Sequence, residues 1–445
     1  MMIRSENRRV KNLVWFVFLL VLTANGLLKL IFPDFPVGVL VVLIALFVLL
    51  KFLHLIVLNN LRIINTPVNG VLVLFIAFGV AQIFNPFLHK PVIGFQGFIA
   101  FFFPILFFFV GANLVIKRQQ VYKIFTYLLH LGLFASIFGI VQIILVQIGT
   151  ATIVPTGDNY GYYYLGSLLK EKVVLVDGGP LFRITSIFSN FSSFAFFLNI
   201  FILTSFGFHF SGHKKRFILM SIIGVIALLF TFLRIAYISI FLGIVLLGYL
   251  RSNRKHILNT SKLLIGGLLI VSLLVALPNN VVSKRVMSLS YKQSSESGVL
   301  AIIMDRLNMY GRYLEIFRGR LLLGNGLGTT LGISEKYAEQ LEFGTVVADN
   351  DFLNVLYQTG IFGISLFFII ILKIFYHGYK IAKRGDQDRL INIPAIIYCI
   401  LVSIIILGLA YNPLVEVPSN YIFWFLAGIL LSYKQKQAME RGELR

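Results

Sequence analysis

Long apolar stretches separated by polar connections follow one another along almost the whole chain. Most hold about 17 to 25 residues, and a helix of that length crosses about 30 Å of hydrocarbon. The apolar positions run continuously, whereas the strands of a membrane barrel would alternate. About twelve spans are expected, near residues 12–32, 37–58, 67–84, 93–116, 122–148, 187–208, 216–232, 235–250, 263–278, 352–376, 392–411 and 419–433. The pattern predicts an all-α, polytopic protein with one membrane domain over residues 1–445.

Two connections are much longer than the others, and both are expected on the extracytoplasmic side. The first covers residues 149–186 and is rich in tyrosine and glycine, and the second covers residues 279–351. Residues 301–318 of the second have apolar side chains at helical spacing and charged ones opposite, which predicts an amphipathic helix. Long connections are commonly functional, although an amphipathic helix that only lies on the membrane is an equally ordinary interpretation.

Composition agrees with the pattern, because 58% of the residues are hydrophobic and only 13% are charged. The net charge of +21 does not require a nucleic-acid partner. Most basic residues fall in connections expected on the cytoplasmic side, where they set topology and contact anionic lipids. With the N-terminus inside and an even number of spans, both termini are expected to be cytoplasmic. The run at 12–32 is too long for a signal peptide and lacks a cleavage site, so it is expected to remain as a helix.

Cys399 is the single cysteine and lies in an apolar run. It excludes a disulfide or a cysteine metal site within one chain. The sequence also shows no nucleotide-sugar domain and no metal-ligand motif, so we expect neither a metal site nor a cofactor.

The stretch 217–250 is apolar except for Arg234, Thr231 and a few serines and tyrosines. It would be about 50 Å long as one helix, too long for one span and short for two. A tight helical hairpin is expected, with Arg234 in its outer turn. Arginine at membrane depth is by default a functional-site hypothesis.

Other polar residues are expected on the same side. Arg183 precedes the span that carries Ser189–Ser193, and Asp349, Asn350 and Asp351 stand at the start of another. Converging arginines are suited to a diphosphate, and a neighbouring carboxylate can act as a general base. The simpler interpretations are interfacial anchors for the arginines and a helix N-cap for residues 349–351. The glycine-rich segment 324–330 could place N–H groups near an anion, although a plain turn is the simpler reading.

The ordered motifs resemble those of the bacterial O-antigen polymerase and O-antigen ligase superfamily, with its Wzy-type and WaaL-type members. The similar segments are Arg183–Asn190, Thr231–Ala236, Arg312 with Leu322–Gly328, Asp349–Leu353 and Gly360–Gly363. Two positions depart from the usual motifs: Leu233 replaces a serine before the hairpin arginine, and Ser189–Phe191 replaces Asn-Pro-Asn.

The resemblance implies a membrane glycosyltransferase that takes a glycan from undecaprenyl diphosphate on the outer face of the cytoplasmic membrane. The implied residues are Asp349, Arg312 and Arg234 as catalytic, and Arg183, Asn190, Arg306, Arg318 and Asn350 as substrate-binding. Ligases carry a histidine before the asparagine that matches Asn350; Asp349 at that position favours a polymerase of repeat units for O-antigen, capsule or exopolysaccharide. Membrane lipids are the expected partners, and a chain-length regulator is a candidate partner.

Two alternatives remain open. One keeps the chemistry but transfers the glycan to a lipid or a protein, as an O-antigen ligase or a protein O-oligosaccharyltransferase does. The other is a flippase for lipid-linked oligosaccharides. Transporters commonly show internal repeats and polar residues near the midplane of the membrane, and the sequence shows neither clearly.

Overall fold

The computed structural model describes ten segments of the chain together with the backbone of four strands and the single residues Gly311, Ile333 and Tyr337. The segments are residues 37–58, 63–88, 90–114, 118–147, 183–188, 190–210, 216–250, 320–330, 349–384 and 392–440. The expected spans 12–32 and 263–278 and the expected amphipathic helix 301–318 lie outside them, apart from Gly311.

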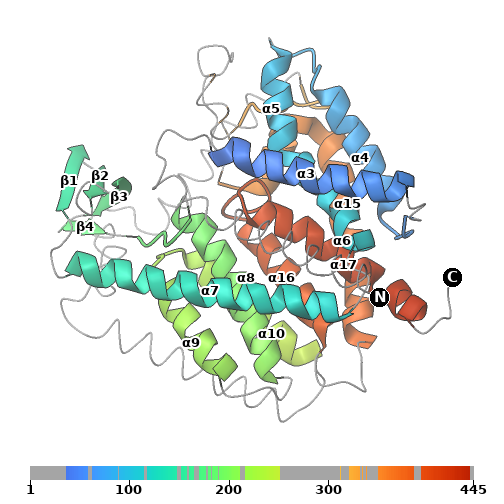
Figure 1. The fold of residues 1–445 in the computed structure, drawn as a ribbon. Coiled ribbons are helices and arrows are strands. Elements are labelled where there is room, and N and C mark those ends of the chain that lie inside the picture. Colours follow the sequence, from blue (N-terminus) through green and yellow to red (C-terminus); the bar gives the residue numbers. More distant parts are fainter. Residues whose placement is uncertain are drawn as a thin grey trace.

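Helices make up most of this part of the chain (Figure 1). They are α3 (Val37–Leu58), α4 (Asn69–Gln82), α5 (Pro91–Phe101), η1 (Phe103–Leu106), α6 (Phe107–Leu114), α7 (Arg118–Gln147), α8 (Phe191–Phe210), α9 (Arg216–Leu229), α10 (Arg234–Leu250), α15 (Asp351–Arg384), α16 (Ile393–Leu407) and α17 (Ser419–Glu440). Each falls on one of the apolar runs read from the sequence. The hairpin expected between 217 and 250 is α9 and α10, and its turn contains Thr231 as predicted.

Four helical segments among the described residues are long and apolar enough to cross a membrane: Pro91–Asn113, Gln119–Leu145, Phe191–Phe210 and Asp351–Lys383. Five shorter apolar helices accompany them, within α3, α4, α9, α10 and α16. The protein is therefore a predominantly helical membrane protein.

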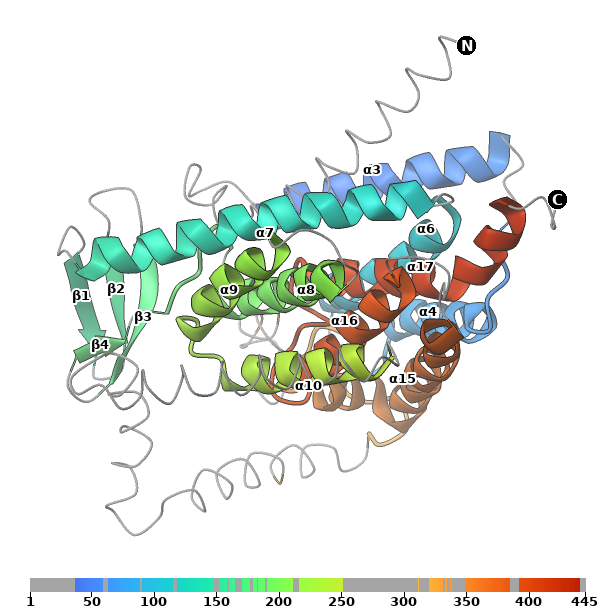
Figure 2. The same ribbon diagram turned by 90° about the horizontal axis from the view of Figure 1, so that it is seen from below.

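The first long connection contains a small antiparallel sheet, which the sequence pattern did not predict. Its strands are β1 (Thr152–Gly157), β2 (Tyr160–Tyr164), β3 (Lys170–Val176) and β4 (Gly179–Leu181), paired in the order β1-β2-β3-β4. Tyrosine and valine favour strands, but their short runs here lack a clear alternating pattern. The purely all-α expectation is thus wrong for residues 152–181. The sheet lies beyond the end of α7 (Figure 2).

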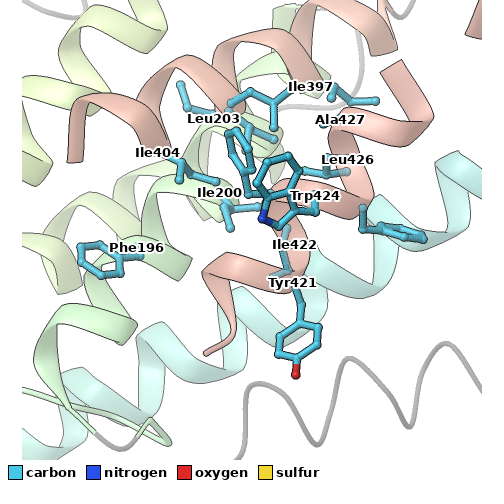
Figure 3. Packing of buried hydrophobic residues seen from close by; sticks show 14 of the residues in the cluster. Phe196, Ile200, Leu203, Ile397, Ile404, Tyr421, Ile422, Trp424, Leu426 and Ala427 are labelled. Carbon is cyan, nitrogen blue, oxygen red and sulfur yellow. The ribbon is translucent and has the colours of Figure 1, made fainter. Parts of the chain in front are cut away.

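Helix α8 occupies the middle of the molecule, with α7 on one side and α10 on the other (Figure 2). Nearly all of its residues are buried, including Phe196, Phe197 and Phe201. Aliphatic side chains of α8 and α16 pack around Trp424 of α17 (Figure 3). An apolar helix buried all round must lie inside a bundle, so the start of α8 is a fixed point of the structure.

Close approach of backbones fixes α17 against α6. A Cβ atom on Gly428 would lie 2.0 Å from the Phe108 carbonyl oxygen, and one on Gly111 would lie 2.1 Å from that of Phe425. Small residues at such crossings let membrane helices pack backbone to backbone. This packing fixes α17, the helix that follows the connection at residues 408–418, against α6.

Connections gather at two ends of the bundle. At the first, which we name the site end, lie residues 83–90, 183–190, 230–234, 349–351 and 408–418. Hydrogen bonds link the last four of these, including Ile184 N to Phe230 O at 3.3 Å and Asn350 Nδ2 to Leu409 O at 2.9 Å. Residues 83–88 contact the glycine-rich turn instead, where Asn85 Nδ2 donates to Leu323 O. At the opposite end, Lys436 Nζ donates to Gly111 O and Gln435 Nε2 donates to Asn65 O.

Candidate functional site

The turn at 183–190 is held tightly against α7. Ser186 adopts a φ of 55°, a left-handed conformation that is uncommon for a residue other than glycine. Its N–H donates to Gln142 Oε1 at 2.9 Å, its carbonyl accepts from Gln142 Nε2 at 3.2 Å, and its hydroxyl donates to Ala135 O at 2.6 Å. Strained backbone of this kind persists where the surroundings determine it and is concentrated at functional sites.

The turn between α9 and α10 contains a second such residue, Phe232, with a φ of 52°. The hydrogen bond from Ile184 N to Phe230 O joins this turn directly to the first. Arg183 adjoins that bond, and Arg234 is the exposed first residue of α10. The two arginines predicted from separate motifs therefore lie on adjoining turns at the site end.

The start of α8 carries a small polar group. Asn190 is its N-cap: its Oδ1 accepts from Ser193 N at 2.7 Å and lies 2.9 Å from Ser192 Oγ. The hydroxyls of Ser192 and Ser193 both lie 2.9 Å from Oε2 of Glu416, in the connection 408–418. The amide of Asn190 also hydrogen-bonds this carboxyl. Asn190 thus fixes the helix start, a role that helps to position the serines.

Glu416 is partly exposed as a residue, but its carboxyl group lies in dense surroundings. Burial raises the pKa of Glu416 to about 7, and the nearby charge of Asp349 adds to the increase. The hydrogen bonds from Ser192, Ser193 and Asn190 act in the opposite direction because they stabilise the charged form. The group therefore gains and loses its proton near neutral pH.

Arg183 lies close to the same connection. Its guanidinium lies over the Phe191 ring, 4.5 Å from the ring centroid, and hydrogen-bonds the hydroxyl of Tyr411. Its Nε is buried and has no hydrogen-bond partner among the described residues. Asp349 is exposed and close enough to Tyr411 and Glu416 for its charge to act on both. One arginine, one phenol and two carboxyl groups thus meet at the site end.

The polar residues at the start of α15 separate into different roles. Asn350 Oδ1 accepts from Phe352 N at 2.9 Å and from Leu353 N at 3.0 Å, so the N-cap interpretation of this residue is confirmed. Asp351 is fully buried and accepts a hydrogen bond from Leu414 N at 3.0 Å. Both tie α15 to the connection 408–418, and Asp349 is the residue of the three whose side chain is exposed.

The glycine-rich segment uses its N–H groups within the protein. Gly324 N donates to Arg320 O, Asn325 N to Tyr357 O, Gly326 N to Gln358 O and Gly328 N to Gln358 Oε1. These four donors are therefore not available to an anion. The segment is a turn that docks onto α15, as the simpler interpretation had it.

Three of the predicted arginines, Arg306, Arg312 and Arg318, lie outside the described residues. Arg320, which follows them, was not predicted. Its guanidinium lies 4.7 Å from the centroid of the Phe87 ring, and its Nη1 donates to Asn325 Oδ1 at 3.0 Å. These contacts hold the glycine-rich turn against the α4–α5 connection.

Residues 219–368 match the family model Wzy_C, described as O-antigen ligase. This part of the chain, about a third of its length, is similar to the O-antigen ligase family. The match supports the resemblance to the O-antigen polymerase and ligase superfamily, whose members are membrane glycosyltransferase-like enzymes. No curated protein matches the sequence.

The matched Wzy_C segment includes the turn with Arg234, the glycine-rich turn and the start of α15. Arg183, Asn190 and Glu416 lie outside it, yet contacts bring them to the same end of the bundle. Sequence reasoning missed Glu416, Tyr411 and the serine hydroxyls. One signal was available: Glu416 is the only acidic residue between Asp388 and Glu440, in a short connection between two apolar runs.

Proposed function

We propose that this protein polymerises oligosaccharide repeat units, carried on undecaprenyl diphosphate, into a surface polysaccharide on the outer face of the cytoplasmic membrane. The observation that supports it is the group of Arg183, Tyr411, Glu416 and Asp349 at the site end of an O-antigen ligase-type protein. Such a group offers a cation for a diphosphate beside carboxylates for a sugar hydroxyl.

In the proposed reaction, an acceptor hydroxyl oxygen attacks the anomeric carbon of the growing chain. The bond from that carbon to the phosphate oxygen breaks, and its electron pair leaves with undecaprenyl diphosphate. Arg183, Arg234 and Arg312 bind the diphosphate and stabilise its developing charge, with Arg306, Arg318 and Asn350 as further contacts to donor or glycan. A carboxylate accepts the hydroxyl proton, and Asp349 is the sequence-based candidate.

The proposal includes a topology. About twelve spans place both termini in the cytoplasm and the site end outside, with residues 149–186 and 279–351 as extracytoplasmic connections. A chain-length regulator is a proposed partner. This arrangement brings the site to the face where lipid-linked glycans are displayed.

A second candidate is ligation, in which the whole glycan passes to a lipid or protein acceptor. The similarity of residues 219–368 to the Wzy_C family of O-antigen ligases favours it. Asp349, at the position where ligases of the superfamily carry histidine, favours polymerisation.

The deciding experiment is a gel of surface polysaccharide from cells that lack the gene and are complemented with variants. We expect wild type to restore a ladder of long chains, and Arg234→Ala to reduce long chains by about 100-fold, the usual cost of losing one charge-stabilising donor. Arg312→Ala is expected to act in the same direction, and Asp349→Ala is expected to do so only where Asp349 itself is the base. A single repeat unit that remains attached to its acceptor identifies polymerisation.

Arg216→Ala is the matched control. Arg216, like Arg234, is the exposed first residue of a helix, but it lies at the opposite end of the bundle. We expect it to restore the full ladder. Long lipid-linked chains that never reach an acceptor would instead identify a ligase. Full rescue by each of the single variants Arg234→Ala and Arg312→Ala would exclude the proposed site.

A further inference from the structure

The carboxyl group of Glu416 has unusual partners for a structural residue. Within the described part of the chain it forms no ion pair with lysine or arginine, and its hydrogen bonds come from two serine hydroxyls and one amide. It is not needed to cap α8, because Asn190 already accepts the Ser193 N–H. Partly buried carboxylates without a cation cost free energy, so a structural role explains this arrangement poorly.

The charged and titratable groups around Glu416 come from three elements. Asp349 and Asp351 belong to the start of α15, and both couple electrostatically to Glu416. Tyr411 belongs to its own connection, and Arg183, from the turn before α8, hydrogen-bonds Tyr411. The two neighbouring carboxyl groups make it harder to remove the proton from Glu416, whereas the hydrogen bonds from Ser192 and Ser193 make it easier. The balance produces a group suited to exchange a proton close to neutral pH.

We propose that Glu416 is the general base that activates the acceptor, and that Asp349 acts on it through its charge. This proposal rests on the proposed glycosyl transfer. The acceptor hydroxyl gives its proton to the Glu416 carboxylate as its oxygen bonds to the anomeric carbon, and the pair of electrons from the broken carbon–oxygen bond leaves on undecaprenyl diphosphate. Glu416 then releases the proton to water, and the cycle balances without any other reactant.

The geometry favours Glu416 over Asp349 for two reasons. Ser192 and Ser193 fix one carboxylate oxygen of Glu416 at the rigid start of α8, so the group is positioned before the acceptor arrives. Asp349 is exposed in the bend before α15. A fixed base with a pKa close to the working pH is the more effective one.

The test uses the full-length protein in detergent and lipid-linked repeat units extracted from cells that lack the gene. The rate of the first glycan transfer is measured from pH 5 to pH 9. For wild type we expect the rate to rise about tenfold per pH unit and to level off above about pH 7. Glu416→Gln preserves the size of the side chain, and we expect its plateau to fall by about 100-fold or more and the pH dependence to disappear.

Two further variants separate catalysis from structure. Asp349→Asn removes a negative charge next to Glu416, so the increase of the transfer rate with pH should occur at lower pH. The double variant Ser192→Ala, Ser193→Ala removes hydrogen bonds to the charged form of Glu416, so the increase of the transfer rate should occur at higher pH. A merely structural Glu416 would not produce opposite displacements. Thermal midpoints and binding of the donor lipid, measured on the same samples, show whether each variant is folded.

The outcomes are distinct. A wild-type profile in Glu416→Gln would overturn the assignment of the base, as would complete loss of transfer in Asp349→Asn with transfer retained in Glu416→Gln. The wild-type product tests the proposed function separately: transfer to an acceptor other than a repeat unit would reject polymerisation and leave the comparison of variants valid. No transfer by wild type under any condition would overturn both proposals.

Discussion

Among single residues, Glu416 connects the stability of the protein to its proposed chemistry. The same desolvation that gives it a pKa of about 7 also makes its ionised form costly in the folded state. Hydroxyls and an amide compensate part of that cost, and no cation among the described residues compensates the rest. A carboxylate whose burial is only partly compensated lowers the stability of the protein, and such a loss of stability is common at catalytic sites.

This cost predicts a pH-dependent stability. The pKa of Glu416 is about 7 in the folded protein against 4.5 for an ordinary glutamate, so its stabilising contribution is complete below about pH 4.5 and is lost as pH rises through 7. The full loss amounts to roughly 3 kcal/mol. Thermal midpoints in detergent should therefore decrease from pH 5 to pH 8 more steeply in wild type than in Glu416→Gln. If the thermal midpoints of the two proteins change with pH in the same way, the pKa of Glu416 is not raised in the folded protein.

Some residues of the candidate site could be predicted from the sequence, and others could not. Arg183 and Arg234 were predicted because each stands in a recognisable motif, and they lie on turns joined by a hydrogen bond. Glu416 could not be predicted in this way, because its partners Ser192 and Ser193 are more than two hundred positions away in the chain. A lone acidic residue in a short connection has no periodicity or spacing from which to infer such contacts.

At the scale of elements, the most informative feature is the kink in α15. The helix holds 34 residues and is interrupted at Gly360, whose φ of 68° and ψ of −170° are not helical. The sequence predicted a span here and a glycine-rich turn nearby, and both exist. It did not predict that the turn docks onto the kink, because the hydrogen bonds Gly326 N to Gln358 O and Ile361 N to Leu321 O join separate parts of the chain.

The kink leads to a prediction about Gly360. A Cβ atom there would lie 2.3 Å from Leu322 O, and the left-handed φ is unfavourable for alanine. Gly360→Ala should destabilise the protein by about 1–3 kcal/mol and displace the glycine-rich turn. The measurement is the thermal midpoint together with protease sensitivity near residues 320–330.

Gly70→Ala provides the comparison for that variant. Gly70 lies in α4 and has open space around its Cα, so alanine there should be neutral or slightly stabilising. Equal thermal midpoints for the two variants would show that the docking of the turn onto α15 is not required for stability.

For the whole molecule, the hydrogen bonds divide the connections into two sets that agree with alternating membrane crossings. Connections predicted outside contact one another at the site end, as Ile184 with Phe230 and Asn350 with Leu409 do. Segments predicted inside do the same at the opposite end, where Gln435 Nε2 donates to Asn65 O and Lys373 Nζ donates to Pro67 O. The pattern of apolar runs predicts such an alternation, because length and hydrophobicity determine where a helix can cross.

The alternation leads to a prediction about orientation. Lys90 and Lys383 are both exposed lysines, and they lie at the site end and at the opposite end respectively. In a Cys399→Ala background, Lys90→Cys should react with a membrane-impermeant maleimide in intact spheroplasts, and Lys383→Cys only after the membrane is permeabilised. Cys399 itself is buried and should contribute little signal before its removal. The reverse labelling would place Arg183, Glu416 and Asp349 in the cytoplasm, on the face opposite to the displayed glycan, and the proposed polymerisation would then be impossible at this site.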